Sequence, residues 1–279
     1  MKYVFFGSPR FAAIIFERLV HADMAPIAIV CNPDRPVGRK KIITPPPTKE
    51  IALRQNILVF QPEKLGGSFG EELKKLAPDF FVVAAYAQII PGAILAIPRL
   101  GTLGTHPSLL PKYRGASPIQ SVILSGEAET GVSIYQMDAK MDHGPIVKSA
   151  SLPFESSSIQ YPALEEKLAE LSANLLAEVI PKLLSGKLEP RVQDETKATY
   201  TKKFKTEDGF VDEKALAAAE HGDKNESERI ARMINAFTPE PGCWTTRDGK
   251  RIKLLQAEIQ NGALKLLVTQ QEGQNPIRR

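Results

Sequence analysis

Two short segments of the chain carry side chains that could do acid–base chemistry. His106 ends a Thr- and Leu-rich run that we expect to be a strand, and a Pro-bounded loop with a basic and aromatic tip at 112–115 follows it. A histidine where a strand gives way to a loop suits a general acid or base near neutral pH. The second segment, Met137–Pro145, is another expected strand end, with two carboxylates and a Gly-Pro turn. By itself, His106 also fits a surface histidine beside a turn.

The composition is that of a folded, soluble chain. Its 279 residues predict one large or two ordinary domains, and 43% hydrophobic with 24% charged residues allows a sizeable core. A net charge of +4 is compatible with a polyanionic partner without requiring one. Cys31 and Cys243 form no CxxC pair, which argues against a disulfide framework and a cysteine zinc site, and we expect no metal. Because we find no signal peptide or membrane-spanning apolar run, we expect a cytoplasmic protein.

The elements that must position these side chains follow an α/β pattern. Tyr3–Phe6 reads as a strand that leads through a Gly-Ser-Pro turn into a helix over 11–20, without a GxGxxG fingerprint or a phosphate loop. Pro26–Cys31 predicts a second buried strand. The continuous apolar run at 79–85 is typical of a central parallel strand covered on both faces. The fold class we predict is α/β with a doubly wound, mostly parallel sheet.

Ligands of open α/β sheets bind beyond the carboxyl ends of the strands. Tyr86, Gln88 and Ile89 follow the central strand and are therefore candidates for a pocket. The alternative is that they form only a connection to the next helix.

A long, basic and proline-rich segment follows the second strand. Residues 32–47 contain the four cations Arg35, Arg39, Lys40 and Lys41 against one acid, Asp34. We expect no regular element here. The segment is either a solvated surface loop or a loop that contacts phosphates.

The second half of the chain predicts a linker and a separate small module. An alternating segment at 131–136 reads as a strand, and Tyr161–Leu184 reads as a long helix that a Ser-Gly pair ends. The domains we expect are 1–186, a charged linker over 187–208, and a module over 209–279. That module should hold one helix near 226–236 and short strands around 243–245, 251–255 and 263–267.

Several motifs occur in one order along the first 205 residues. They are Gly7–Pro9, Asn32–Arg39, Ala85–Pro91, His106–Gly115, Glu129–Val132, Gln136–Asp138, Met141–Pro145, Gln193–Glu195 and Ala198–Tyr200. This ordered set resembles the methionyl-tRNA formyltransferase family, which uses formyltetrahydrofolate. The resemblance implies a catalytic formyltransferase domain, a linker and a small OB-like β-barrel that contacts tRNA. With about 70 residues after the linker, the barrel is expected to be abridged.

The resemblance also implies a catalytic Asn, a His two residues later and an Asp on the second loop. His106 and Asp142 match the last two, and Gly104 stands where the family has Asn. The Asn amide would be one donor to the oxyanion of the tetrahedral intermediate. Its absence should lower activity, unless a backbone N–H, a water or the Thr105 hydroxyl replaces it. We expect Gly104 to leave open space beside the strand, so that Gly104→Asn should raise kcat.

The remaining site residues are expected on the same resemblance. The folate-binding residues implied are Tyr86, Gln88, Ile89, Ile90, Ser108, Leu109, Leu110, Pro111 and Asp138, and those for tRNA or methionine are Phe11, Arg35, Arg39, Lys40 and Lys41. The implied co-substrate is 10-formyltetrahydrofolate and the implied partner is initiator methionyl-tRNA, with the enzyme a monomer and no membrane involved. Three alternatives stay open: a folate- or tRNA-binding homologue with impaired catalysis, an amino-sugar formyltransferase, and a formyltetrahydrofolate hydrolase.

Overall fold

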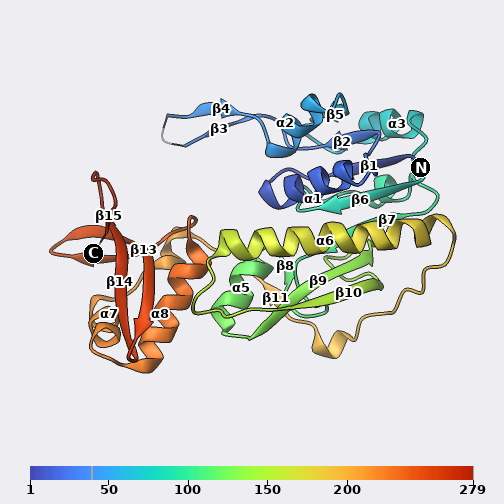
Figure 1. Cartoon of the computed structure of the whole chain (residues 1–279). Coiled ribbons are helices and arrows are strands. Elements are labelled where there is room, and N and C mark those ends of the chain that lie inside the picture. The colour runs from blue at the N-terminus through green and yellow to red at the C-terminus, as the bar shows by residue number, and fades with distance from the viewer. Residues whose placement is uncertain (39, 279) are drawn as a thin grey trace. The chain divides into compact units, whose positions relative to one another are not determined.

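The computed structural model describes residues 1–38 and 40–278, which form two compact units (Figure 1). The first unit comprises Met1–Arg114, Gly131–Ser151 and Glu166–Thr199, and the second comprises Gly115–Thr130, Leu152–Glu165 and Tyr200–Arg279. Each unit thus draws on separate stretches of the chain. The boundaries 1–186, 187–208 and 209–279 stay a prediction.

A seven-stranded sheet forms the first unit, in the order β10-β9-β7-β6-β1-β2-β5. Its first five strands in the chain are parallel neighbours, and β9 runs antiparallel to β7. The bounds are β1 Tyr3–Phe6, β2 Ala28–Val30, β5 Leu58–Phe60, β6 Phe80–Ala84, β7 Thr102–His106, β9 Glu129–Gln136 and β10 Ile146–Pro153. The predicted doubly wound, mostly parallel sheet is confirmed.

Both faces of the central strands are covered by helices. Val4 and Phe6 of β1 belong to a core cluster that includes residues of α3 (Gly67–Lys75) and α4 (Gly92–Leu95). On the opposite face Phe5 stacks on Phe16 of α1 (Arg10–His21), with ring centroids 5.6 Å apart. Each buried Phe stabilises the fold by about 1.5–3 kcal/mol. Burial on both faces explains why these strands are continuous apolar runs.

From Glu166 onward, helix α6 (Tyr161–Leu184) belongs to the first unit, where it lies beside α1. Arg10 and Arg18 of α1 form ion pairs with Glu166 and Glu170 of α6. Because these charges are about half exposed, each pair contributes little stability, and the buried helix faces contribute more.

The order of the strands places a topological switch point at β1. The chain first adds β2 and β5 on one side of β1, and then β6 and β7 on the other. At the turn after β1, an added Cβ on Gly7 would come within 2.6 Å of the Ala12 Cβ and 2.7 Å of the Ala84 carbonyl oxygen, so only glycine fits. Ligands of such sheets bind at this edge, where β7 also ends at His106.

The basic segment forms a regular element, and the expectation of an irregular loop was wrong. β3 (Arg35–Val37) and β4 (Ile42–Thr44) pair as an antiparallel hairpin that precedes α2 (Pro47–Arg54). Pro36 is tolerated because a two-stranded ribbon leaves one edge of each strand free of ladder hydrogen bonds. Arg39, one of the four predicted cations, lies outside the described residues.

The second unit contains a four-stranded antiparallel sheet in the order β12-β13-β14-β15. Its strands are longer than predicted, and a helix that we did not predict, α7, precedes the expected one, α8. The bounds are α5 Pro118–Ser125, α7 Glu213–Glu220, α8 Lys224–Phe237, β12 Cys243–Arg247, β13 Lys250–Gln260, β14 Ala263–Gln271 and β15 Ile277–Arg278. Asp212 caps α7 by accepting from the backbone N–H groups of Lys214 and Ala215.

Short elements complete the chain. β8 (Arg114–Gly115) pairs with β11 (Tyr200–Thr201), and two 3₁₀ turns span Glu195–Lys197 and Thr206–Gly209. Within residues 1–38 and 40–278, every helix is too short or too polar to cross a membrane.

Candidate functional site

The pairing of β7 with β9 aligns four side-chain positions on one face of the sheet. His106 lies opposite Ser133, and Gly104 lies opposite Tyr135. Directly opposed residues of an antiparallel pair share a face, and residues two apart on a strand do as well. His106 and Tyr135 are therefore presented side by side, with Gly104 beneath the aromatic ring.

One ring nitrogen of His106 is held by a hydrogen bond, and the other is available for proton transfer. It is 6% exposed, and its Nε2 lies 2.8 Å from the carbonyl oxygen of Tyr113. Because a carbonyl can only accept, Nε2 carries the hydrogen whether the ring is neutral or charged. Nδ1 is therefore the atom that gains or loses a proton, and it lies 3.6 Å from Oδ2 of Asp142.

Asp142 comes from the loop between β9 and β10. The amide of Gln136 donates to the carbonyl oxygen of Pro145 and closes this loop. Asp142 has a left-handed backbone, with φ 48°, and its Oδ1 accepts a hydrogen bond of 2.7 Å from the hydroxyl of Tyr135. The structure thus brings His106 and Asp142 together, as the sequence predicted, and adds Tyr135 to them.

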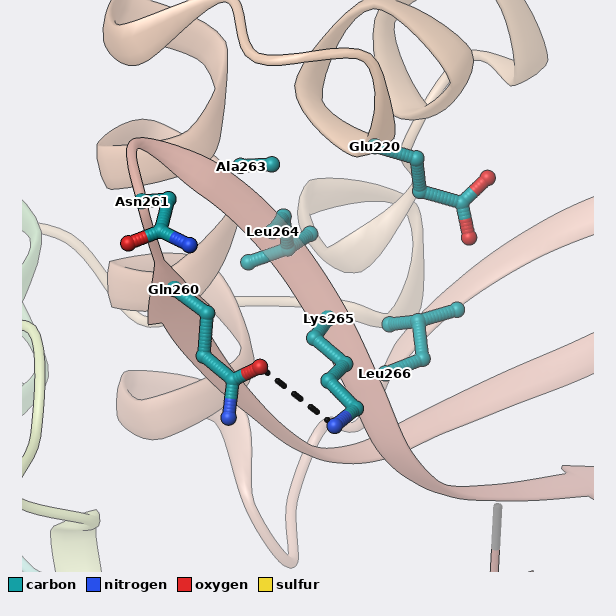
Figure 2. Close-up of a pocket in the computed structure, with 7 residues that line it drawn as sticks. All are labelled: Glu220, Gln260, Asn261, Ala263, Leu264, Lys265 and Leu266. Atoms are coloured by element: carbon teal, nitrogen blue, oxygen red, sulfur yellow. Dashed lines mark hydrogen bonds between the residues drawn. The ribbon is translucent and has the colours of Figure 1, made fainter.

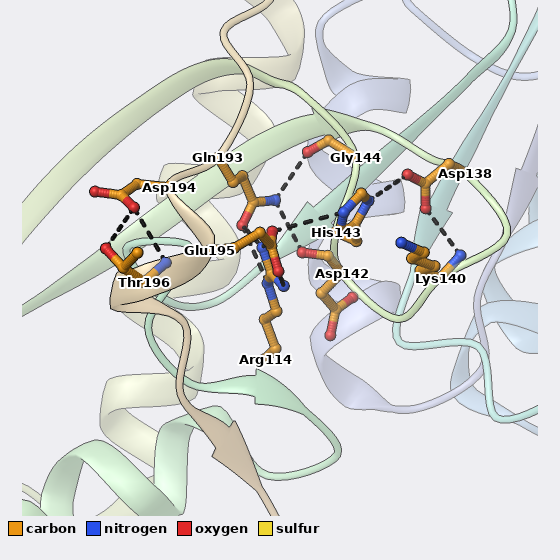
Figure 3. Close-up of polar contacts among 10 residues, drawn as sticks. All are labelled: Arg114, Asp138, Lys140, Asp142, His143, Gly144, Gln193, Asp194, Glu195 and Thr196. Atoms are coloured by element: carbon orange, nitrogen blue, oxygen red, sulfur yellow. Dashed lines mark hydrogen bonds and ion pairs between the residues drawn. The ribbon is translucent and has the colours of Figure 1, made fainter.

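Gln193 and Arg114 fix the backbone of the Asp142 loop (Figure 3). The Gln193 amide donates to the carbonyl oxygens of Asp142 and Gly144 at 2.9 and 2.8 Å. Its Oε1 in turn accepts from Nε and Nη2 of Arg114, a fully buried side chain, at 3.1 and 2.7 Å. Sequence reasoning assigned neither residue a role, although both lie in quoted motifs.

Further charged side chains lie around the Asp142 loop. The hydrogen bond from Arg114 holds the pKa of Glu195 below its usual range. Burial acts to raise the pKa of Asp138, but hydrogen bonds from His143 and the Lys140 amide outweigh it, and the net pKa is lowered. Both carboxyls are therefore ionised at neutral pH.

Tyr135 fills the space that we expected to be open beside Gly104, and that expectation was wrong. A Cβ added to Gly104 would lie 2.5 Å from Cε1 and Cζ of the Tyr135 ring and 2.8 Å from its hydroxyl oxygen. Burial, followed by the charge of Asp142, raises the pKa of Tyr135 well above 10. The phenol is thus a neutral hydrogen-bond donor at working pH. A glycine inside a buried strand, which marks a close approach, was the sequence signal for this contact.

Comparisons with known proteins decide the family. Residues 1–180 match the formyl transferase model and residues 224–274 match the formyl transferase C-terminal domain. The chain is 38% identical over 259 residues, 92% of its own length and 79% of the relative, to the methionyl-tRNA formyltransferase of Staphylococcus aureus strain MW2. The chain belongs to the methionyl-tRNA formyltransferase family.

Solved structures agree at the level of the fold. A methionyl-tRNA formyltransferase from Clostridium thermocellum has a TM-score of 0.63 and 17% identity, covering 97% of this chain and 98% of its own. HypX from Aquifex aeolicus in complex with tetrahydrofolic acid has a TM-score of 0.68 and 15% identity. The match covers 100% of this chain and 46% of the HypX chain.

The segment after β6 has one group suited to a polar ligand. Tyr86 packs edge-on against Phe6, with centroids 5.6 Å apart, and burial raises its pKa to about 12. Its hydroxyl is buried and has no hydrogen-bond partner within 1–38 and 40–278. Gln88 donates to the carbonyl oxygen of Pro62 at 3.3 Å, Ile89 is 93% exposed, and Ile90 packs in the core. Among the described residues of this segment, Tyr86 is the one with a buried side-chain polar atom that lacks a partner.

The other segment implied for folate is braced by β9. The Ser133 hydroxyl donates to the Ser108 carbonyl oxygen at 2.9 Å and accepts from the Leu110 amide at 3.0 Å. Ser108 is fully buried, and its own hydroxyl donates to the Lys112 carbonyl oxygen. Leu109 and Pro111 are half-buried. That residues 108–111 contact folate stays a prediction.

The candidates for tRNA and methionine divide into buried and exposed groups. Phe11 is 4% exposed in the first turn of α1, so it packs in the core of the first unit. Arg35, Lys40 and Lys41 are exposed on the β3–β4 hairpin, and Arg35 forms an ion pair with Glu63. Their roles in methionyl-tRNA binding stay a prediction.

A separate hollow of about 560 Å³ lies in the second unit (Figure 2). It is lined by the β13–β14 turn and by Glu220 of α7, and Lys265 donates to Gln260 at 3.4 Å across its rim. Its lining contains no residue predicted for the site.

Proposed function

We propose that the chain transfers the formyl group of 10-formyltetrahydrofolate to the α-amino group of methionine on initiator methionyl-tRNA. The observation that carries the proposal is 38% identity over 92% of the chain to a curated methionyl-tRNA formyltransferase. The reaction forms a bond between the amine nitrogen and the formyl carbon and breaks the bond from that carbon to N10. One proton leaves the amine and one proton arrives at N10, so atoms balance without a further reactant.

His106 and Asp142 supply the proton chemistry in this proposal. Nδ1 of His106 accepts the proton that the amine releases, because Nε2 already carries a hydrogen for the Tyr113 carbonyl. Asp142 Oδ2, 3.6 Å away, stabilises the imidazolium that results. The same Nδ1–H then donates to N10, which must be protonated to leave. One histidine thus acts as base and then as acid.

The folate is proposed to bind beyond the ends of β1, β6 and β7. The unpartnered hydroxyl of Tyr86 is the supporting feature, since a buried polar group without a partner lowers stability unless a ligand or water satisfies it. Gln88, Ile89, Asp138 and the 108–111 segment complete the proposed site. The proposed chemistry needs no metal.

The β3–β4 hairpin is the proposed tRNA contact of the first unit. Lys40 and Lys41 are exposed cations at its turn, and Val37, Ile42 and Ile43 are 57, 61 and 62% exposed. Apolar side chains so exposed beside cations suit a partner that offers both phosphates and bases. Phe11 remains the proposed neighbour of the methionine side chain. We further propose a cytoplasmic monomer whose second unit adds phosphate contacts through Lys250, Arg251 and Lys253.

A direct assay tests this function. The protein is incubated with 10-formyltetrahydrofolate and methionyl-tRNA, and we expect N-formylmethionyl-tRNA as the product. A reaction without tRNA measures hydrolysis of the folate, and one with a nucleotide-linked amino sugar measures transfer to that acceptor. Formylation of the sugar alone, or hydrolysis alone, would replace the proposed function by the corresponding alternative.

The salt dependence of tRNA binding tests the hairpin. Replacing Lys40 and Lys41 by Ala is expected to weaken binding and to flatten the slope of log K against log salt by up to about two units, because each lost phosphate contact contributes roughly 0.7–0.9. Binding of folate should not change. Lys74→Ala with Lys75→Ala on α3 removes two adjacent exposed lysines as a control. An unchanged slope in the hairpin variant would exclude it as a phosphate contact.

A further inference from the structure

We propose that Tyr135 is a positioning residue for the formyl transfer: its hydroxyl holds one oxygen of Asp142 so that the other faces Nδ1 of His106. The catalytic part of this inference rests on the proposed function. The chain of contacts is short, with 2.7 Å from the Tyr135 hydroxyl to Asp142 Oδ1 and 3.6 Å from Asp142 Oδ2 to His106 Nδ1. Each oxygen of the carboxylate therefore has a separate neighbour.

The Tyr135 ring is fixed in place by its surroundings. It is 4% exposed, and the β7–β9 register sets it directly over Gly104. The distance of 2.5 Å from an added Gly104 Cβ to two ring atoms shows that the ring lies against the glycine backbone. The hydroxyl is consequently presented to Asp142 by a rigid strand pair and needs little ordering of its own.

The hydrogen bond from Tyr135 acts on the carboxylate of Asp142 itself. Gln193 donates to the carbonyl oxygens of Asp142 and Gly144 and so places the backbone of the loop. The Asp142 side chain is 16% exposed. Without the phenol, Oδ1 loses this donor, and the carboxylate is held less firmly toward His106.

Several charges surround this carboxylate. His106 faces it from β7 and Tyr135 from β9, while Asp138 and His143 belong to its own loop. Glu195 approaches His143, with 3.6 Å between Oε1 and Nε2. Glu195 is itself paired with Arg114, and Asp138 with His143, whereas the Tyr135 hydroxyl donates directly to the Asp142 carboxylate and favours its charged form.

The test removes only the hydroxyl. Tyr135→Phe keeps the ring over Gly104. Tyr3→Phe is the matched control, because the hydroxyl of this buried tyrosine also makes a partly buried hydrogen bond, 2.6 Å to the Met24 carbonyl oxygen, at the amino end of β1. In Tyr135→Phe we expect kcat to fall about 10- to 100-fold, the loss of one hydrogen bond to a charged group, with KM within about twofold. Because the carboxylate of Asp142 is then held less firmly toward the imidazolium of His106, the acid limb of the pH–rate profile should move to lower pH. Tyr3→Phe should change neither.

A double-mutant cycle and a substrate-free measurement complete the test. Tyr135→Phe should have no further effect on kcat in an Asp142→Asn background, because the two act as one unit. The Tyr135 hydroxyl proton should give a slowly exchanging NMR signal that is lost in Tyr135→Phe and shifted in Asp142→Asn. If the kcat losses of Tyr135→Phe and Asp142→Asn were additive, or if Tyr135→Phe left the pH profile unaltered, Tyr135 would contribute only to packing and not to the position of Asp142. A wild type that does not formylate overturns the proposed function, and the hydroxyl signal then still decides whether Tyr135 holds Asp142.

Discussion

Replacing His106 by Gln is expected to lower kcat by about 10²- to 10⁴-fold, the usual contribution of a positioned general acid or base, while KM for methionyl-tRNA changes little. Glutamine can still donate to the carbonyl oxygen of Tyr113, which His106 Nε2 does at 2.8 Å. It cannot accept and return a proton at the position of Nδ1. Initial rates over a range of pH measure the effect, and the acid limb of the wild-type profile should disappear with it.

His21 provides the control for this prediction. It lies exposed in the last turn of α1, and His21→Gln removes the same functional group without touching the site. We expect wild-type rates and an unchanged profile. If His106→Gln instead retained kcat within about twofold, the proton would have to move through another group, and the assignment of His106 as base and acid would be wrong.

The parallel sheet was predictable because burial on both faces removes polar residues from its strands. The run at 79–85 became β6, and Tyr3–Phe6 became β1. The β3–β4 hairpin was missed because its strands are only three residues long and exposed, so no apolar alternation marks them. Helix α7 was missed as well, although Asp212 before an Ala-rich run is a helix-start signal.

The site was predictable where chemistry and chain order coincide. His106 and Asp142 each follow a strand, and the resemblance paired them before the structure did. Tyr135 carried no such mark, because in the sequence it is one aromatic residue of an alternating strand. Its role follows from the register that sets it against Gly104, and a register between distant strands depends on long-range packing that a local pattern does not encode. Roles assigned to other residues stay predictions.

Introducing Asn at Gly104 is expected to damage the protein, which reverses the expectation drawn from the sequence. The new Cβ would lie 2.5 Å from two atoms of the Tyr135 ring, and a buried ring cannot retreat without breaking its bond to Asp142. Overpacking of this kind lowers the free energy of unfolding by about 1–3 kcal/mol. Thermal denaturation should show a melting temperature lower by roughly 2–10 °C, and kcat should fall because Asp142 loses its donor.

Two further variants separate the steric effect from the amide. Gly104→Ala carries the same Cβ without an amide, so it should destabilise the protein similarly. Tyr135→Leu opens space beside residue 104, so the double variant with Gly104→Asn should be more stable than the sum of the single changes predicts, by about 1–3 kcal/mol. If Gly104→Asn alone melted at the wild-type temperature and had a higher kcat, the ring would not be fixed over Gly104, and an amide would be the better donor at this site. If the double variant shows this non-additive stability, Gly104 and Tyr135 form one structural unit. The absence of a side chain at Gly104 then leaves room for the phenol that orients Asp142.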